Sequence, residues 1–309
     1  MKEVNQIKSE DFQGGVFPDL AVLYPEELEA MYAAASVQMF DADYCVLEEG
    51  QRVEHLYLVK AGLLRVIKQH AGNTYEVASI VPGQMFGEAS MIYHGVAGAE
   101  VRTMEPAILY SIPFTVMYDI LEGNERFLRA TTQLAEKRSA ATAIAVNPIF
   151  STLPMAVREV LLFNARFLTL AEGEVLLAEG ENDDHHIFLV LAGRLSVELQ
   201  HPTKKQERIY LSQLSSGDEA GEISIVTGLP HMATVTALEP VRVMAIASNS
   251  VVAWARRYTD FAYALYGLVY RKLKQTQDIL KGILSKEEAK VLTLNTMPSL
   301  EEFKRQHHL

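Results

Sequence analysis

The stretch AGEISIVTGLPHMATV, residues 220–235, carries more structural information than any other part of this 309-residue sequence. A second stretch of the same length, FGEASMIYHGVAGAEV at residues 86–101, shares its Gly-Glu-x-Ser core. The two stretches begin at Phe86 and Ala220, 134 positions apart. A segment of this length that recurs within one chain indicates an internal repeat.

Three further blocks recur on either side of these stretches, in the same order. They pair LEEG at 47–50 with LAEG at 177–180, HLYLVKAG at 55–62 with HIFLVLAG at 186–193, and Glu105-Pro106 with Glu239-Pro240. The offset grows only from 130 to 134, so the small insertions fall between strands, where a fold tolerates them. The sequence therefore predicts two copies of one domain. The predicted bounds are an N-terminal tail at 1–16, a first domain with its closing helix at 17–145, a second domain with its closing helix at 146–284, and a C-terminal tail at 285–309.

Each copy follows the same order of predicted elements. Apolar residues at three- and four-residue spacing predict an entry helix at 25–35 and another at 154–165. Segments of four to eight residues, broken by Gly, Asn or Asp, predict strands at 56–59, 63–68, 75–80 and 108–112, and at 187–191, 195–199, 209–214 and 241–246. Such spacing indicates a jelly roll. The predicted fold class is mainly β with flanking helices, as two tandem jelly-roll β-barrels, each followed by a closing helix.

The closing helices are predicted at 124–144 and 260–284. In the second of them, residues at steps of 4, 4, 3, 4 and 3 approach a heptad seam, which consists of Leu265, Val269, Leu273, Thr276, Leu280 and Ile283. Two interpretations stay open for this seam. It packs against its own barrel, or it associates with a second chain in a homodimer through the helix at 260–284.

This order of helix, strands, Gly-Glu loop and closing helix resembles the cyclic-nucleotide-binding domain, the module of catabolite activator proteins and kinase regulatory subunits. The resemblance covers about residues 17–144 and 147–284, and the two 16-residue stretches correspond to the family's phosphate-binding cassette. It implies that Glu88 and Glu222 accept a hydrogen bond from a ribose 2′-hydroxyl. Gly87 and Gly221 would let the backbone approach a ligand, and the short helix that follows each would face an anion with free N–H groups.

Both cassettes depart from the family at the residue that neutralises the cyclic phosphate. The family has an arginine nine residues after the glutamate, whereas this chain has Ala97 and His231. Losing one partner of a desolvated charge pair costs about 2–5 kcal/mol. Four explanations stay open: a protonated His231 replaces the arginine, Arg102 reaches back into the first pocket, the ligand is an uncharged nucleoside, or both pockets are vestigial.

The candidate ligand-binding residues are those of the two cassettes. They are Gly87, Glu88, Ala89, Ser90, Ala97 and Gly98 in the first copy, and Gly221, Glu222, Ile223, Ser224, His231, Met232, Ala233 and Thr234 in the second. In the first copy Gly98 loosens the loop, and Glu100 would repel an anion if it turned inward. In the second, the Thr234 hydroxyl can donate a hydrogen bond. In the family an aromatic or aliphatic residue of the closing helix caps the base, and the candidates here are Phe261, Tyr263, Tyr266 and Tyr270.

Composition limits the class of protein. Hydrophobic residues make up 49% and charged residues 22%, which is ordinary globular material. The net charge of −11 disfavours nucleic acid as a partner. The single cysteine, Cys45, excludes an intrachain disulfide and a thiolate metal cage. The first residues lack the apolar segment of a signal peptide, and no stretch reaches 18 consecutive apolar residues, so we expect a cytoplasmic protein without membrane insertion.

The sequence carries no catalytic motif: it has no Walker loop, HExxH, GxSxG or CxxC. The pairs His185-His186 and His307-His308 are poorly placed for a metal, so we expect no metal site, no cofactor and no enzyme activity. The 25 residues after Leu284 are too few for a helix-turn-helix domain, which disfavours a transcription factor. Two functions remain. The chain is a regulatory sensor of cAMP, cGMP or a nucleoside that signals to an unknown protein partner through its closing helices, or it is a ligand-free scaffold for docking or dimerisation.

Overall fold

The structure, a computed structural model, describes residues 16–93, 95–182, 186–285, 287–288 and 305. His94, His185, His307, His308 and most of the two predicted tails lie outside the described residues. The chain divides into two compact units between Thr142 and Ala143, and each unit is described by itself. None of the described helices combines the length and the hydropathy that a membrane span requires.

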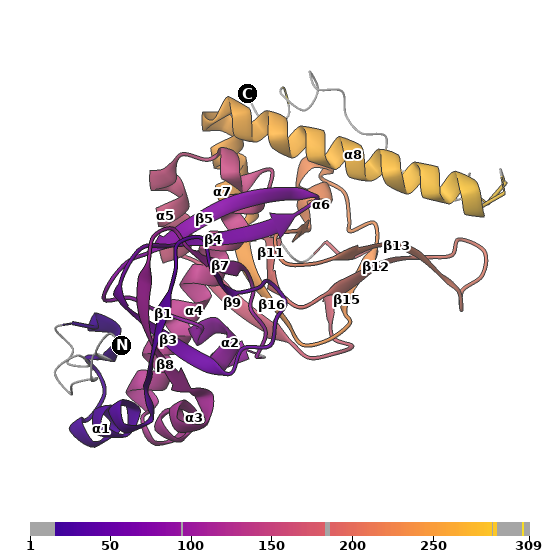
Figure 1. Ribbon diagram of the computed structural model, residues 1–309. Coiled ribbons are helices and arrows are strands. Elements are labelled where there is room, and N and C mark those ends of the chain that lie inside the picture. The colour runs from indigo at the N-terminus through magenta and orange to yellow at the C-terminus, as the bar shows by residue number, and fades with distance from the viewer. Residues whose placement is uncertain (1–15, 94, 183–185, 286, 289–304, 306–309) are drawn as a thin grey trace. The chain divides into compact units, whose positions relative to one another are not determined.

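The first unit consists of two four-stranded sheets with helices before and after them (Figure 1). Its elements are η2 (Pro18–Leu20), α1 (Pro25–Ala34), β1 (Ser36–Phe40), β2 (Cys45–Leu47), β3 (His55–Ala61), β4 (Leu64–His70), β5 (Asn73–Ile80), β6 (Met85–Phe86), α2 (Glu88–Tyr93), β7 (Glu100–Thr103), β8 (Ala107–Pro113), α3 (Phe114–Gly123) and α4 (Glu125–Val146). One sheet has the order β1-β8-β3-β6 and the other β2-β7-β4-β5, with every neighbour antiparallel.

The second unit repeats this arrangement. Its elements are η3 (Phe150–Thr152), α5 (Met155–Phe163), β9 (Arg166–Leu170), β10 (Val175–Leu177), β11 (His186–Ala192), β12 (Leu195–Gln200), β13 (Arg208–Leu214), β14 (Glu219–Ala220), α6 (Glu222–Thr227), β15 (Thr234–Ala237), β16 (Val241–Ala247), α7 (Ser248–Arg257) and α8 (Thr259–Ile283). The sheet orders, β9-β16-β11-β14 and β10-β15-β12-β13, correspond strand by strand to those of the first unit. The predicted fold class, two tandem and mainly β domains with flanking helices, is confirmed.

The eight predicted strands correspond to β3, β4, β5 and β8 and to their counterparts in the second unit. The prediction missed the shorter strands, such as β2 and β6. A strand of two or three residues is too short to show an alternating pattern, so only the backbone pairing with a neighbour defines it.

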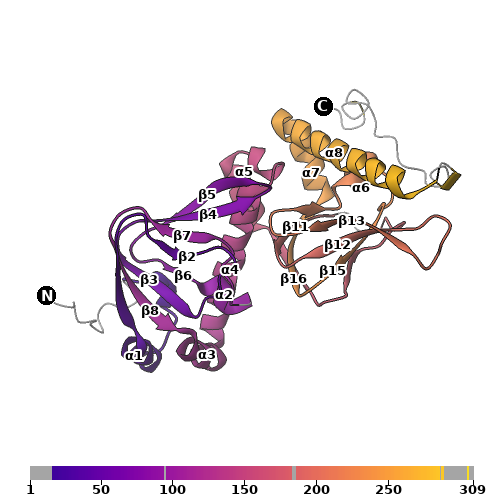
Figure 2. The same ribbon diagram turned by 45° about the vertical axis from the view of Figure 1, so that its right-hand side comes forward.

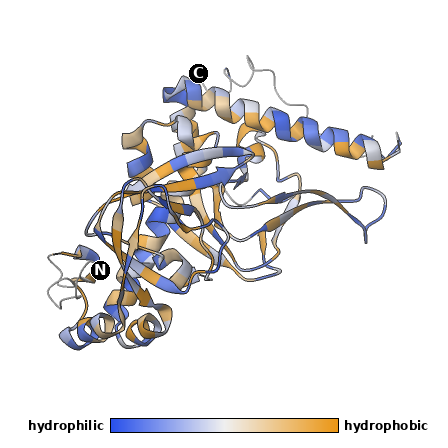
Figure 3. Cartoon of the chain, in the orientation of Figure 1, coloured by the Kyte–Doolittle hydropathy of each residue, from blue (hydrophilic) through white to orange (hydrophobic). Residues whose placement is uncertain are grey.

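The core of each unit lies between its two sheets. In the second unit this core joins residues of β11 and β16 in one sheet to residues of β10, β12 and β15 in the other, among them Phe188, Val190, Val243, Leu177, Leu195 and Val235. Figure 3 shows hydrophobic residues along many of the strands and a hydrophilic loop between β12 and β13. Apolar burial of this kind is the main favourable term in folding.

Two helices, rather than the single predicted one, follow the last strand in each unit. In the first unit α3 and α4 meet at Asn124, whose side-chain oxygen accepts a hydrogen bond from the Phe127 N–H at 2.9 Å and so caps α4. The Asn124 amide donates to Glu27 at 2.8 Å. The prediction missed α3, which directly continues the apolar pattern of β8, and α7, which begins with the polar residues Ser248 to Ser250 directly after β16.

The seam predicted on α8 is largely covered by its own unit. Leu265, Val269, Leu273 and Leu280 are buried, and Leu280 packs with Leu199, Ile209 and Leu284. Ile283 at the end of the seam is 55% exposed. This burial favours the interpretation that the seam packs against its own barrel.

Candidate functional site

The cassette glycines are required by the protein itself. Gly87 and Gly221 have φ values of +93° and +91°, a region that glycine adopts without strain. A Cβ atom on Gly221 would lie 2.6 Å from the carbonyl oxygen of His186, and one on Gly87 would lie 2.9 Å from that of His55. Packing within the domain is therefore enough to explain these glycines without a ligand. Each lets the cassette backbone pass close to the first residue of a neighbouring strand, His55 of β3 or His186 of β11.

The cassette glutamates begin short helices and point inward. Glu88 is the first residue of α2 and Glu222 the first of α6, and both side chains are buried. Positions 97 and 231, where the resemblance implies an arginine, also correspond in the structure. Each makes two backbone hydrogen bonds to an earlier loop, at residues 50–51 in the first unit and 180–181 in the second. Gly50 donates to Ala97 and Gly180 donates to His231, both at 2.8 Å.

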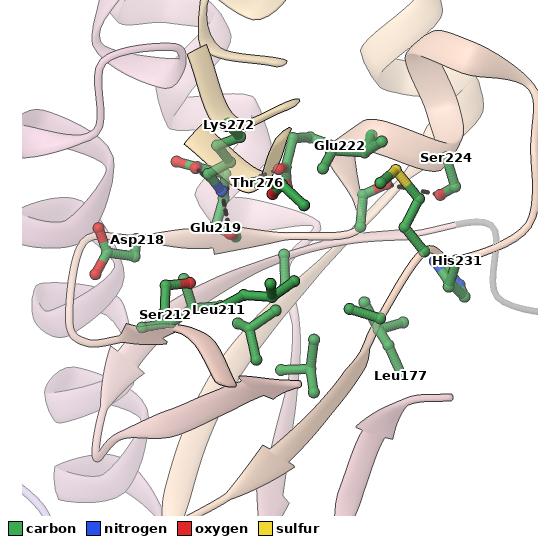
Figure 4. Close-up of a pocket in the computed structure, with 18 of the residues that line it drawn as sticks. Leu177, Leu211, Ser212, Asp218, Glu219, Glu222, Ser224, His231, Lys272 and Thr276 are labelled. Carbon is green, nitrogen blue, oxygen red and sulfur yellow. Dashed lines mark hydrogen bonds and ion pairs between the residues drawn. The ribbon is translucent and has the colours of Figure 1, made fainter. Parts of the chain in front are cut away.

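A cavity of about 310 Å³ opens beside the second cassette (Figure 4). Small-molecule sites typically have volumes of about 300–1,000 Å³. Its lining combines polar residues of the cassette and α8 with an apolar wall, which consists of Leu177, Val197, Leu211, Leu214, Val235 and Ile279. The second unit thus holds a space of the right size for a small ligand.

Seven of the eight residues predicted as ligand contacts in the second cassette line this cavity: Gly221, Glu222, Ile223, Ser224, His231, Met232 and Ala233. Thr234 does not. Its hydroxyl oxygen lies 3.3 Å from the Glu179 N–H, so its role is within the protein. The Ser224 hydroxyl donates to the Gly221 carbonyl at 2.8 Å, which fixes the first turn of α6.

Four residues of α8 that the sequence analysis missed as site residues also line the cavity. Lys272, Gln275, Thr276 and Ile279 follow the i, i+3, i+4, i+7 spacing of one helix face. This spacing shows only that they share a face, and the sequence carries no signal that this face meets the cassette.

The aromatic residues predicted to cap a base do not line the cavity. Phe261 is buried against Phe150 and Trp254, and Tyr263 and Tyr270 are about half exposed. Tyr266 lies in the same part of α8 and likewise takes no part in the lining. The prediction failed because all four residues precede the turns of α8 that pass over the cassette.

A buried ion network joins α8 to the cassette. The ammonium nitrogen of Lys272 lies 2.6 Å from Glu219 Oε1 and 2.9 Å from Glu222 Oε1, and it donates to the Glu219 carbonyl at 2.9 Å. A lysine has three N–H donors, so all three are used. Asn147 donates to the second carboxylate oxygen of Glu219.

The second oxygen of Glu222 differs from the other acceptors in this network. Glu222 Oε2 is buried and has no hydrogen-bond partner among the described residues. Burial, opposed by the Lys272 ammonium and assisted by Glu219, raises the pKa of the Glu222 carboxyl above its ordinary value. Burial alone would lower the pKa of Lys272, but its two carboxylate partners raise it. Lys272 therefore stays charged, and the unpartnered oxygen beside the cavity can accept a hydrogen bond from a ligand.

In the first unit a cation from α4 binds the cassette glutamate. Arg138 donates to Glu88 Oε1 at 3.0 Å and to the Met85 carbonyl at 2.6 Å through the same nitrogen. Ser90, another predicted contact, donates to the Val96 carbonyl. Ala89 is partly buried one position after Glu88.

Two expectations about the end of the first cassette can now be decided. Arg102 does not reach back into the pocket, because its Nε donates to Glu100 at 2.6 Å. That pairing also neutralises Glu100. The exposed Gly98 accepts a hydrogen bond from Lys68 Nζ at 2.7 Å, and Lys68 is in turn paired with Glu49. The charged groups around this end of the cassette are therefore occupied by one another.

Comparison with known proteins gives two kinds of match. The sequence profile of the cyclic nucleotide-binding domain matches residues 37–124 and 167–258. The cAMP-dependent protein kinase regulatory subunit of Yarrowia lipolytica is 28% identical over 210 residues, which are 68% of this chain and 51% of the relative. The chain thus spans about half the length of that relative.

Two solved structures are similar over most of the chain. The regulatory domain of Toxoplasma gondii PKA with cAMP is 20% identical, with a TM-score of 0.39, and the match covers 89% of this chain and 99% of that one. The regulatory subunit of a cAMP-independent protein kinase A from Trypanosoma cruzi, bound to guanosine, is 17% identical, with a TM-score of 0.35 and coverage of 91% and 94%.

Proposed function

The chain belongs to the cyclic nucleotide-binding domain family, and from that premise we propose that it is a non-catalytic regulatory protein whose second domain binds a neutral, nucleoside-like ligand. The observation that carries this proposal is Glu222 Oε2, a buried acceptor without a partner, at the edge of a cavity of about 310 Å³. A ribose hydroxyl is a neutral donor that satisfies it. A buried carboxylate oxygen without a hydrogen bond is energetically costly. A ligand that donates a hydrogen bond to it therefore gains affinity.

The charge of the cavity argues against a cyclic phosphate. Lys272 is the only lysine or arginine among the described residues of its lining, and its three N–H donors are already used. Three carboxylates, those of Asp218, Glu219 and Glu222, belong to the same lining. The charged residues of the lining thus carry net negative charge, which disfavours an anionic ligand.

The proposal assigns a signalling role to α8. Because α8 supplies part of the lining, a ligand in the cavity binds more tightly when α8 is docked than when it is not. A ligand shifts a conformational equilibrium by its difference in affinity for the two states. Occupancy would thus be converted into the position of α8, which a protein partner reads.

The name of the Yarrowia lipolytica relative suggests the class of partner. We propose that it is a protein kinase catalytic subunit. Size-exclusion chromatography of the chain with a purified catalytic subunit, with and without ligand, tests this part of the proposal. Co-elution that does not depend on ligand would support docking without sensing.

The ligand proposal is tested by isothermal titration calorimetry with guanosine, adenosine, cAMP and cGMP. We expect a nucleoside to bind more tightly than either cyclic nucleotide. Glu222→Met keeps the volume but removes the acceptor, and a hydrogen bond to a charged group is worth about 1.5–3 kcal/mol, so affinity should fall by about tenfold or more. Glu207→Gln, at an exposed position on the β12–β13 hairpin, is the matched control and should bind like the wild type.

A ligand-free scaffold is the second candidate function, and the first cassette favours it. Ala97 replaces the arginine, Glu88 is paired with Arg138, and Glu100 is paired with Arg102. Absence of heat and of thermal stabilisation with all four compounds at millimolar concentration would reject the ligand proposal and leave the scaffold.

A further inference from the structure

Both units tie the closing helix to the cassette glutamate through a cation at the same spacing. Arg138 follows Glu88 by 50 positions, and Lys272 follows Glu222 by 50 positions. Each cation also donates to the carbonyl three residues before its glutamate, Met85 in the first unit and Glu219 in the second. The two residue types differ but share these two contacts, and Lys272 adds a third, to the Glu219 carboxylate.

In the second unit, Lys272 lies in the part of α8 that lines the cavity. Lys272 is in the same face of α8 as Gln275 and Thr276, which line the cavity (Figure 4). Figure 2 shows α8 running alongside α6, the helix that Glu222 begins. Further along, Leu280 and Leu284 pack on Leu199 and Ile209 of the β12–β13 hairpin.

We infer that Lys272 is a positioning residue that couples the ligand site to α8. By binding Glu222 Oε1 it leaves Oε2 without a hydrogen-bond partner among the described residues, and by the same contact it holds the helix that completes the cavity. A ligand donor on Oε2 and the Lys272 ammonium on Oε1 bind one carboxylate at the same time. This inference rests on the proposed function, because the ligand side of the coupling requires a ligand at Glu222.

The coupling has a reciprocal consequence. If the link between Lys272 and the cassette raises ligand affinity by holding α8, ligand must strengthen the docking of α8 by the same factor. The link can therefore be tested from the helix side without ligand and from the ligand side by affinity.

The first experiment is hydrogen exchange of the ligand-free full chain. We expect Lys272→Met to raise amide exchange in residues 272–283 by about tenfold or more, the size of a typical coupling. The helix α7 should keep its wild-type exchange. Lys281→Met is the matched control, since Lys281 is on the same helix but pairs only with Asp278 at the surface. Lys272→Arg should retain protection, because Arg138 of the first unit makes the corresponding contacts to the cassette glutamate and to the carbonyl three residues before it.

Lys272→Met leaves two buried carboxylates without a cation, and the variant can fail to fold for that reason. The double variant Lys272→Met/Glu222→Gln keeps only Glu219, which Asn147 still binds, and should show the same local rise in exchange. An even rise over the whole second unit, or none in α8, would overturn the inference.

The second experiment is calorimetry with guanosine and adenosine. Lys272→Met should lose about tenfold or more in affinity, Lys272→Arg should recover part of that loss, and Lys281→Met should bind like the wild type. If Lys272→Met does not fold, the double variant is compared with Glu222→Gln alone, so that the difference between these two reports on Lys272. A nucleoside should also slow exchange in α8 of the wild type. Wild-type affinity in Lys272→Met, together with lost affinity in Glu222→Met, would overturn the coupling while the ligand site stands. If no nucleoside binds the wild type, the proposed function fails, and the coupling fails with it, although exchange still shows whether Lys272 holds α8.

Discussion

At the scale of single residues, the most informative position is 231, nine residues after Glu222 of the second cassette. His231 is held by the same backbone hydrogen bonds as Ala97, and its side chain is buried in the cavity lining. The two cassettes therefore share the same backbone geometry at this position, and neither carries the guanidinium that the resemblance implies there. The missing group is an electrostatic partner for a phosphate, and nothing else in the described lining replaces it.

His231→Arg should restore affinity for cyclic nucleotides. A desolvated charge pair that regains its partner gains about 2–5 kcal/mol, so the affinity for cAMP or cGMP should rise by about thirtyfold or more, measured by calorimetry. Ala97→Arg, at the matching position of the first cassette, is the comparison. If His231→Arg binds cyclic nucleotides no better than the wild type, the matching backbone hydrogen bonds of Ala97 and His231 do not mark a phosphate-binding position.

The raised pKa of Glu222 predicts a pH dependence of stability. A carboxyl whose pKa is higher in the folded state holds its proton more tightly there, so it reduces stability as pH rises from its ordinary value through the raised one. Glu222→Gln removes this loss. We therefore expect the unfolding free energy of Glu222→Gln, relative to the wild type, to increase with pH from about 4.5 upward, in urea titrations at several pH values.

Glu288 provides a control of opposite sign. Hydrogen bonds from Ser285 and Thr203 lower the pKa of Glu288 to about 2. Its stabilising contribution is therefore present above its ordinary pKa and is lost as pH falls toward 2. Glu288→Gln should therefore have a lower unfolding free energy than the wild type at neutral pH, and this difference should disappear at low pH. A Glu222→Gln profile with the same direction as that of Glu288→Gln would contradict the assigned environment of Glu222.

At the scale of elements, the junction between helices matters most. Asn124 ends α3 and caps α4, while its amide donates to Glu27 and to the Val22 carbonyl ahead of α1. One buried side chain thus fixes where α4 begins and ties it to the entry helix. Asn147 has a similar position at the end of α4, where its oxygen accepts from the N–H groups of Ile149 and Phe150.

Asn124→Ala should lower the unfolding free energy by about 1–2 kcal/mol, the usual cost of a lost helix cap, and slightly more because Glu27 loses a donor. Asn124→Asp keeps the cap oxygen but loses the amide, so it separates the two contributions. Chemical denaturation monitored by circular dichroism measures both. An Asn124→Ala variant as stable as the wild type would show that the cap makes no net contribution.

At the scale of the whole molecule, the two domains share a fold but differ in the residues that could hold a ligand. In the first domain the charged groups around the end of the cassette pair with each other, Lys68 with Glu49 and Arg102 with Glu100. In the second domain Glu222 keeps an acceptor without a partner. Duplication thus preserved the scaffold in both domains and an available acceptor in the second.

We therefore expect one nucleoside per chain. Calorimetry should give a stoichiometry near one, and Glu222→Met should weaken this single binding event by about tenfold or more. Glu88→Met, the corresponding change in the first domain, should leave both affinity and stoichiometry unchanged. Two equivalent sites per chain, or loss of binding in Glu88→Met, would show that the first cassette is also a ligand site.

The sequence by itself determined the duplication, the mainly β fold and the position of both cassettes, because these depend on local patterns that recur at a fixed offset. It also identified Ala97 and His231 as departures from the family. The tertiary structure decided which turns of α8 lie over the cavity, and that register placed Lys272 at the site instead of the aromatic residues. Helical periodicity fixes which residues share a face but not which face meets the cassette, since that depends on how α8 packs against α6. The ion network of Lys272, Glu219 and Glu222 arises from that packing, so the spacing of 50 residues had no visible meaning before the fold was known.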